Sequence, residues 1–148
     1  MPRTKYNNDM EKDFACGCII IKDNQVLLEK QKHKDERFWS FPKGHKEGNE
    51  TDEETALREI KEEVGLDVKI IDKNPVKMEY DIYSEDGEHR RIPKTVLLFL
   101  AEIVGDATTS LQEAEVEAVE FVPIAEVAEK LTFQAAKDAW QEALKRLV

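Results

Sequence analysis

Cysteine and long apolar runs are both scarce in this sequence of 148 residues. Its two cysteines, Cys16 and Cys18, have neither a second pair nor a nearby histidine and make a poor zinc site. Strand alternation predicts that both face the same core. The longest apolar runs, such as residues 96–101, are too short to cross a bilayer, and the N-terminus lacks the apolar stretch of a signal peptide. We therefore expect a cytoplasmic protein without disulfides or a membrane segment.

Positive charge is also in short supply. Lys and Arg number 22 against 32 Asp and Glu, which gives a net charge of −10 at pH 7. Affinity for a phosphate backbone comes mainly from clustered Lys and Arg, so no stable binding to nucleic acid is expected. A small polyphosphate remains compatible with this charge, because it can arrive with divalent cations that make an acidic pocket locally cationic.

Linkers rich in Pro, Gly or Ser, internal repeats and low-complexity tracts are missing as well. We therefore expect a single domain over residues 1–148, with residues 1–12 as a flexible arm or short edge strand. Whether the protein is a monomer or a homodimer stays open.

Hydrophobic patterning predicts strands that alternate with helical regions. Thr51 or Asp52 should cap a helix that ends at Gly65, and Pro123 should begin a helical stretch. The expected strands, loops and final helix, in chain order, are strands at 14–22 and 25–30, a charged loop at 31–37, strands at 38–43, 67–72, 76–83 and 95–103, a loop at 105–110, a strand at 115–122 and a helix at 134–147. This order predicts a mixed sheet covered by helices, in an α/β or α+β layered fold.

Acidic residues are abundant, and they are concentrated in the stretch 44–66, GHKEGNETDEETALREIKEEVGL. Glu59, Glu62 and Glu63 stand at i, i+3 and i+4, so their carboxylates should converge on one face of the predicted helix. Like charges at this spacing weaken a helix, so a positive partner is expected there. A second, apolar face should dock the helix on the core through Ala56, Leu57, Ile60 and Val64.

This stretch has the pattern Gly44, five residues, Glu50, seven residues, Arg58-Glu59-Ile60, one residue, Glu62-Glu63, one residue, Gly65-Leu66, and it resembles the Nudix box at every defined position. The resemblance implies a Nudix-type α/β/α sandwich with a mixed sheet between helices. It also implies hydrolysis of a phosphoanhydride with the help of Mg²⁺ or Mn²⁺. Clustered carboxylates suit these oxygen-preferring ions better than zinc.

The resemblance assigns roles within the box. Glu59, Glu62 and Glu63 are the implied metal-binding carboxylates, and the carbonyl of Lys43 is a further candidate ligand. Arg58 would orient Glu59 and steady the cluster. The general base stays open, because family members place it either at the position of Glu59 or outside the box.

Other positions of the pattern have structural roles by the same resemblance: Gly44 and Gly65 shape the backbone, and Glu50 supports the loop. A carboxylate outside the box often completes the site in this family. Glu115 is the candidate here, as catalytic residue and metal ligand, with its neighbours Glu113 and Glu117 as alternatives.

The flanking sequence resembles diadenosine tetraphosphate hydrolases. The similar segments are 38–45, FWSFPKGH, together with Tyr83, residues 94–96 and residues 99–102. By this resemblance three cations would bind the phosphates and two aromatic residues would stack on a base, namely Lys43, His45 and Lys94, and Tyr83 and Phe133. Packing in the core is the alternative interpretation of both aromatic residues.

Two classes of function follow. The first is a metal-dependent pyrophosphohydrolase that cleaves a dinucleoside polyphosphate, for the tetraphosphate into ATP and AMP. Nucleoside triphosphates, RNA 5′ ends and diphosphoinositol phosphates are alternative substrates. The second is a nucleotide-binding sensor without catalysis, which the intact box carboxylates disfavour.

Overall fold

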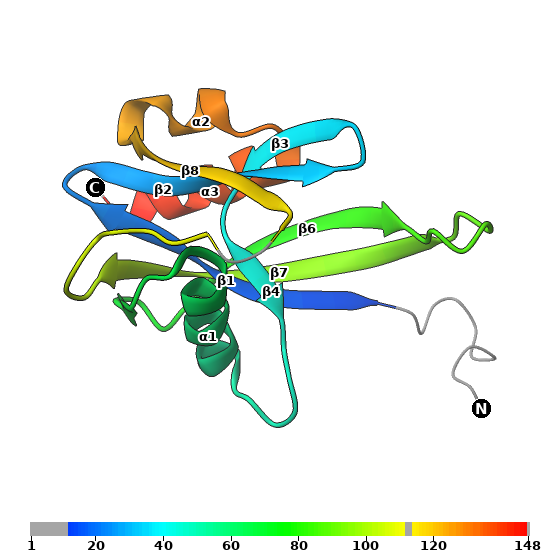
Figure 1. Cartoon of the computed structure of the whole chain (residues 1–148), viewed down its shortest axis with the longest axis horizontal. Coiled ribbons are helices and arrows are strands. Elements are labelled where there is room, and N and C mark those ends of the chain that lie inside the picture. The colour runs from blue at the N-terminus through cyan, green and yellow to red at the C-terminus, as the bar shows by residue number, and fades with distance from the viewer. Residues whose placement is uncertain (1–11, 112–113, 148) are drawn as a thin grey trace.

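The structure, a computed structural model, describes residues 12–111 and 114–147. A mixed β-sheet lies between helices, which confirms the predicted layered fold (Figure 1). The predicted arm lies outside the described residues except for Lys12. The elements are β1 Asp13–Lys22, β2 Gln25–His33, β3 Glu36–Ser40, β4 Lys43–His45, α1 Asp52–Val64, β5 Val68–Ile70, β6 Val76–Tyr83, β7 Arg91–Ile103, β8 Val116–Pro123, a 3₁₀ turn Ile124–Glu126, α2 Val127–Lys130 and α3 Gln134–Leu147.

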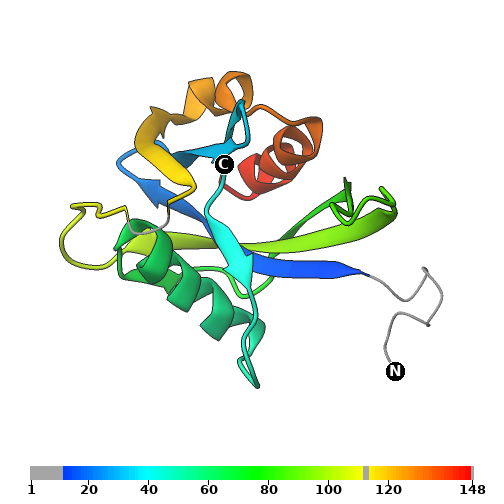
Figure 2. The same cartoon turned by 45° about the vertical axis from the view of Figure 1, so that its right-hand side comes forward.

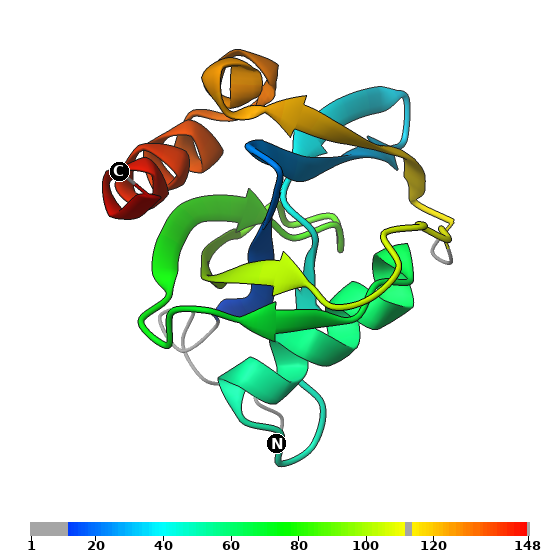
Figure 3. The ribbon, with the colours of Figure 1, turned by 90° about the vertical axis from the view of Figure 1, so that its left-hand side faces the viewer.

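The parallel pair of β1 and β7 is the centre of the sheet. β7 also pairs with β5 and β6, and β1 pairs with the short strand β4, all antiparallel. β2 pairs with β1 only beside their turn, where Asp23 and Asn24 adopt the positive φ angles of 50° and 67° that such a tight hairpin needs. It then diverges to pair with β3 and β8, so the strands form two groups at different levels (Figure 3).

Each side of the sheet buries its own hydrophobic cluster. Ile19 of β1 packs in the cluster that contains Trp140 of α3. Cys16 and Cys18 face the opposite cluster, together with Ile60 of α1, and both thiols are free and buried. This confirms the prediction that the two cysteines share one core face.

Helix α1 has the ends that the sequence predicts. The Thr51 hydroxyl accepts a hydrogen bond from the backbone N–H of Glu54, whose carboxylate accepts one from the Thr51 N–H in return. Gly65 follows the helix in the left-handed conformation, with φ of 77°, and its N–H donates to the Lys61 carbonyl. Local sequence alone therefore determines where the box helix begins and ends.

The predicted charged loop at 31–37 is wrong. β2 continues to His33 and β3 begins at Glu36, so most of this segment is a hairpin. The cross-strand pairs Lys32 with Arg37 and His33 with Glu36 extend the ladder into the charged sequence. Charge alone does not end a strand when its backbone groups find partners.

Other predicted boundaries also shift. The strand predicted for 38–43 is two strands, which end and begin on either side of Pro42, and β7 begins at Arg91 instead of residue 95. Pro93 is tolerated there because, among the described residues, β7 pairs with β6 alone before Lys94. The missing N–H of Pro93 therefore interrupts no second ladder of that part of the chain. The helical stretch after Pro123 contains only a 3₁₀ turn and the short helix α2. No helix within the described ranges combines the length and apolar character needed to cross a membrane.

Candidate active site

The segment before α1 approaches its neighbours so closely that an added Cβ would clash at two glycines. An added Cβ at Gly17 of β1 would lie 2.1 Å from the carbonyl oxygen of Pro42. An added Cβ at Gly44 of β4 would lie 1.9 Å from the carboxyl carbon of Glu59. The carboxylate of Glu59 therefore packs directly on the backbone of β4, and Gly44 provides the space.

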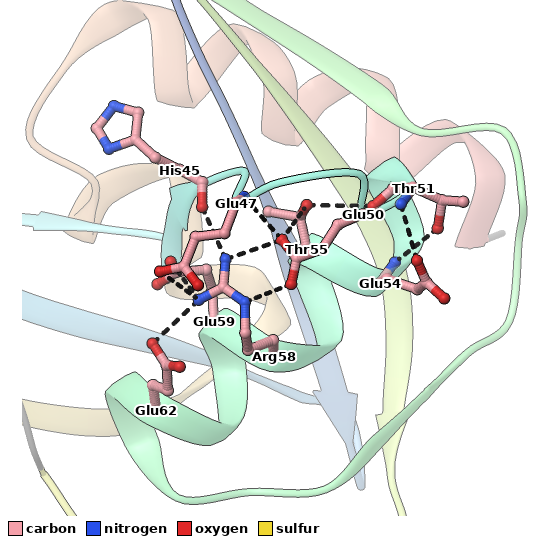
Figure 4. Close-up of polar contacts among 9 residues, drawn as sticks. All are labelled: His45, Glu47, Glu50, Thr51, Glu54, Thr55, Arg58, Glu59 and Glu62. Atoms are coloured by element: carbon pink, nitrogen blue, oxygen red, sulfur yellow. Dashed lines mark hydrogen bonds and ion pairs between the residues drawn. The ribbon is translucent and has the colours of Figure 1, made fainter.

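Arg58 is the centre of a polar network that joins α1 to the preceding loop (Figure 4). Its side chain is only 20% exposed. The guanidinium donates to carboxylates and to one backbone carbonyl: Glu50 at 2.5 and 3.0 Å, Glu59 and Glu62 each at 3.1 Å, and the His45 oxygen at 2.8 Å. The positive partner expected for the acidic helix face thus comes from the helix itself.

Glu50 ties the loop to the helix. Besides Arg58, its carboxylate accepts hydrogen bonds from the Thr55 hydroxyl and from the backbone N–H of Glu47, each at 2.9 Å. The hydrogen bonds from Arg58 are the main reason that the pKa of Glu50 falls to about 2. These contacts suit the supporting role that the family resemblance implies for Glu50.

Glu63 points to a different place from Glu59 and Glu62. It is 7% exposed and accepts a hydrogen bond of 3.1 Å from the backbone N–H of Lys43. Burial raises the pKa of Glu63 and lowers the pKa of the Lys43 ammonium group. The structure thus divides the three predicted metal carboxylates, with two held by Arg58 and one beside Lys43.

Glu29 of β2 is a residue of this site that the sequence interpretation missed. It has no exposed surface, and its carboxyl lies against that of Glu63. Burial is the main cause that raises the pKa of Glu29, and the neighbouring Glu63 adds to it. The sequence does contain a signal, because Glu29 is an acidic residue directly after the apolar run Val26–Leu28 of a predicted strand. The strand pattern alone assigns it no role beyond its place in the strand.

The donor set fits a hydrated divalent cation. Every candidate ligand is an oxygen, and Oε1 of Glu29 is buried without a hydrogen-bond donor in the described part of the chain. Within residues 12–111 and 114–147, no group of three or more acidic, histidine or cysteine side chains is placed to hold a metal ion by itself. Mg²⁺ can be bound through one or two carboxylates, because it usually retains several water ligands.

A cleft of about 850 Å³ opens beside Lys43. The β6–β7 hairpin lies on one side of this region, and β3 with the start of α3 lies on the other (Figure 2). Four of the five predicted substrate-binding residues line it, namely Lys43, Tyr83, Lys94 and Phe133. His45 is not among the lining residues.

Asp13, at the start of β1, connects His45 to Lys94. Its carboxylate lies 3.0 Å from Nε2 of His45 and 3.1 Å from the Lys94 ammonium group. Burial raises the pKa of Asp13, but the hydrogen bonds from these two side chains outweigh it, and the net shift is downward. His45 is therefore at the edge of the site, and its carbonyl contacts Arg58.

The two predicted stacking residues are both accessible. Tyr83 is 54% exposed and Phe133 is 49% exposed, which argues against the core position considered for Phe133. The ring centroid of Tyr83 lies 5.8 Å from that of His89, and the centroid of Phe133 lies 5.1 Å from that of Phe38. Each residue thus presents an aromatic surface supported by a second ring.

Glu115 precedes β8 and has an exposed side chain. Its carbonyl accepts a hydrogen bond of 2.8 Å from the backbone N–H of Lys32. Of the two alternatives, Glu117 forms an ion pair with Arg37 at 2.8 Å, and Glu113 lies outside the described residues. The role of Glu115 stays a prediction.

Relatives that are named for several different activities match this chain. A bis(5′-nucleosyl)-tetraphosphatase [asymmetrical] from Sus scrofa is 31% identical over 140 residues, covering 86% of this chain and 90% of the relative. A putative mutator protein MutT4 from Mycobacterium tuberculosis is 34% identical over 82% of this chain, and the chain spans only 50% of that relative. An ADP-ribose pyrophosphatase from Methanocaldococcus jannaschii is 34% identical over 68% of this chain and 57% of the relative.

Solved structures show the same fold. The Ap4A hydrolase of C. elegans, in a binary complex, superimposes with a TM-score of 0.73 at 20% identity, covering 91% of this chain and 97% of that one. The NUDIX domain model matches residues 12–144. Enzymes of this family generally use divalent metal ions. The chain therefore belongs to the NUDIX domain family.

Proposed function

We propose that this protein is a metal-dependent pyrophosphohydrolase that cleaves dinucleoside polyphosphates, with diadenosine tetraphosphate split into ATP and AMP. The observation that carries the proposal is that Lys43 adjoins both the box helix and the cleft. Its backbone N–H contacts Glu63 of the box helix, and its side chain lines the cleft that contains Lys94, Tyr83 and Phe133. The carboxylates proposed for the metal therefore adjoin a cleft that holds cations for the phosphates and aromatic surfaces for the bases.

The proposed metal ligands are oxygens of Glu59, Glu62 and Glu63 and the Lys43 carbonyl. When bound there, Mg²⁺ or Mn²⁺ neutralises phosphate charge and lowers the pKa of a water molecule. Lys43 and Lys94 hold the phosphate chain by charge. Glu59, oriented by its hydrogen bond from Arg58, is one candidate carboxylate to accept a proton from that water. In the balanced reaction, the water oxygen bonds to phosphorus, the bridging oxygen leaves, and one proton is released to the carboxylate or to solvent.

Two relatives favour a dinucleoside substrate over other Nudix substrates. The Sus scrofa tetraphosphatase matches nearly its whole length, and the C. elegans structure is of an Ap4A hydrolase. The cleft also offers two aromatic surfaces, at Tyr83 and Phe133, as a substrate with a base at each end requires. ADP-ribose is the second candidate, because the M. jannaschii relative carries that activity in its name.

The test is a substrate panel with Mg²⁺ that contains diadenosine tetraphosphate, ADP-ribose, ATP, 8-oxo-dGTP and RNA with a 5′ triphosphate. Chromatography of the products should show ATP and AMP in equal amounts, with the largest kcat/KM for diadenosine tetraphosphate. A larger value for ADP-ribose would reassign the substrate. Nucleotide binding without any turnover would instead favour the sensor hypothesis.

Glu63→Gln should lower kcat by roughly 10³-fold, because the change removes one carboxylate oxygen from the proposed metal site while the side chain keeps its size. The measurement is steady-state kinetics together with the circular dichroism spectrum, which should stay unchanged. The matched control is Glu142→Gln on α3, where the carboxylate forms a surface pair with Lys145. Turnover of the Glu63 variant at the control's rate would remove Glu63 from the site.

A further inference from the structure

The position of Glu29 is unusual for an acidic residue. Alternation along β2 places it on the same face as Leu27, which packs in the hydrophobic cluster of Ile60 and Val64 on α1. Its carboxyl therefore points from the sheet toward the box helix, and it has no exposed surface. A carboxyl buried in this way costs free energy unless its oxygens are satisfied.

Only one of the two Glu29 oxygens has a donor within the described ranges. Oε2 accepts a hydrogen bond of 2.6 Å from the side-chain amide of Gln31, which fixes the orientation of the carboxyl group. Oε1 has no donor, and the neighbouring group is another carboxyl, that of Glu63. Two adjacent acceptors from different elements, one of them unsatisfied, are the arrangement that a cation would bridge.

The pairing of β2 with β8 is irregular close to Glu29. Lys30 faces Ala118 and Gln31 faces Val116, so Glu117 of β8 is the extra residue at this register shift. Such bulges occur preferentially beside functional sites. Gln31, the residue that holds Glu29, lines the wall of the cleft.

We propose that Glu29 is an additional carboxylate ligand, supplied by β2 and acting with Glu63, for the divalent cation of this enzyme. The sequence pattern of the box does not contain this residue. The inference deepens the proposed function and rests on its metal dependence, but not on the choice of substrate. Mg²⁺ and Mn²⁺ are the cations whose preference for oxygen ligands fits the pair.

The test measures metal binding without substrate. Mn²⁺ binding to the whole protein is followed by electron paramagnetic resonance, and Tm is recorded with and without Mn²⁺. Glu29→Gln should weaken Mn²⁺ binding by at least about tenfold, as expected when a metal site loses a carboxylate contact. It should also remove most of the increase in Tm that Mn²⁺ produces, because that increase depends on affinity.

Glu79→Gln is the matched control, since Glu79 is an exposed carboxylate on β6 and its change removes the same charge. The control should bind Mn²⁺ like the unaltered protein. Undiminished Mn²⁺ affinity in Glu29→Gln would make Glu29 a purely structural partner of Glu63 and overturn the proposal, as would a parent protein that binds no Mn²⁺.

Failure of the inference and failure of the proposed substrate give different results. If Glu29→Gln loses Mn²⁺ affinity while no dinucleoside polyphosphate is cleaved, the ligand assignment stands and the substrate is wrong. If diadenosine tetraphosphate is cleaved and Glu29→Gln binds Mn²⁺ normally, the substrate stands and the ligand assignment is wrong.

Discussion

Arg58 donates hydrogen bonds to more groups of the box than a side chain without a planar guanidinium group could reach. It donates to Glu50, to the carboxylates of α1 and to the His45 carbonyl, which belong to the loop, the helix and β4. An ammonium group has a single nitrogen and cannot reach all of these acceptors. The shape of the guanidinium, and not only its charge, therefore holds the loop on the helix.

Arg58→Lys should accordingly lower Tm by roughly 5 °C, which for a chain of this size corresponds to the loss of a few charged hydrogen bonds. It should lower kcat as well, because Glu59 loses its orienting contact. Thermal unfolding and steady-state kinetics measure the two effects. The control is Arg91→Lys, an exposed side chain that pairs with Asp81 at 3.0 Å and should change Tm by no more than about 1 °C. Equal Tm values for the two variants would show that charge alone suffices.

The lowered pKa of Glu50 predicts a pH dependence of stability. The pKa falls from its ordinary value of 4.5 to about 2 on folding. Between these two pH values the unfolded chain binds more protons at this residue, so its contribution to stability rises with pH, is complete above the upper value and is absent below the lower one. Glu50→Gln should therefore destabilise the protein most at neutral pH and progressively less as the pH falls through the window. Tm curves of the two proteins that run parallel over the whole range would contradict this.

Sequence reasoning at the residue scale succeeded where a residue type has few alternative uses. The single arginine among the box carboxylates was expected to contact Glu59, and it lies 3.1 Å from that carboxylate. Glu29 was missed because the burial of an acidic side chain depends on which elements pack over its face of the sheet. That packing follows from the order of strands and helices in space, which is not a local property of the sequence. His45 lies outside the cleft for a similar reason, since its partner Asp13 comes from a strand far away in the chain.

At the scale of elements, the approach of β4 to α1 depends on Gly44. An added Cβ would displace the Glu59 carboxyl group, whose carbon lies 1.9 Å away, but this group is the movable end of a long side chain. Gly44→Ala should therefore reduce kcat strongly, by roughly 10²-fold, with little change in Tm, because an orienting contact is lost while the core is untouched. Kinetics and thermal unfolding are measured on the same preparation.

Gly48→Ala is the informative contrast. Gly48 has a positive φ of 57°, and no atom of the described residues lies within 4 Å of an added Cβ. The change strains the backbone without touching the carboxylates, so it should lower stability by about 1 kcal/mol and leave kcat unchanged. If both glycine variants lost activity in proportion to stability, the specific contact of Gly44 with Glu59 would not be the cause.

Elements were predicted correctly where local signals decide them. Helix α1 has a capping box at Thr51 and a left-handed glycine at Gly65, and both lie within the sequence of the helix itself. The β2–β3 hairpin and the early start of β7 were missed, because these strands are extended by pairs between residues such as His33 and Glu36 that have no apolar pattern. Strand length is set by the partner strand as much as by the strand's own residues.

For the whole molecule, the net charge of −10 has to be reconciled with a polyanionic substrate. The cleft places Lys43 and Lys94 where the phosphates would bind, and Lys94 is held by Asp13. Charge repulsion from the rest of the surface is screened over about 8 Å at physiological ionic strength. Under the proposed function, local cations and a bound metal ion would therefore control phosphate binding, and affinity for the bases would come from uncharged contacts.

Tyr83→Ala and Phe133→Ala test those uncharged contacts. Stacking of a base on an aromatic side chain contributes about 1–2 kcal/mol, so each change should raise KM for diadenosine tetraphosphate about five- to thirtyfold while kcat changes little. If the two residues contact separate bases, the free-energy losses should add in the double variant. Phe14→Ala is the control, because Phe14 is an aromatic residue of comparable exposure, at 36%, that does not line the cleft. KM for inorganic polyphosphate should stay constant in all variants, and an equal rise there would mean that the aromatic residues shape the cleft instead of binding the bases.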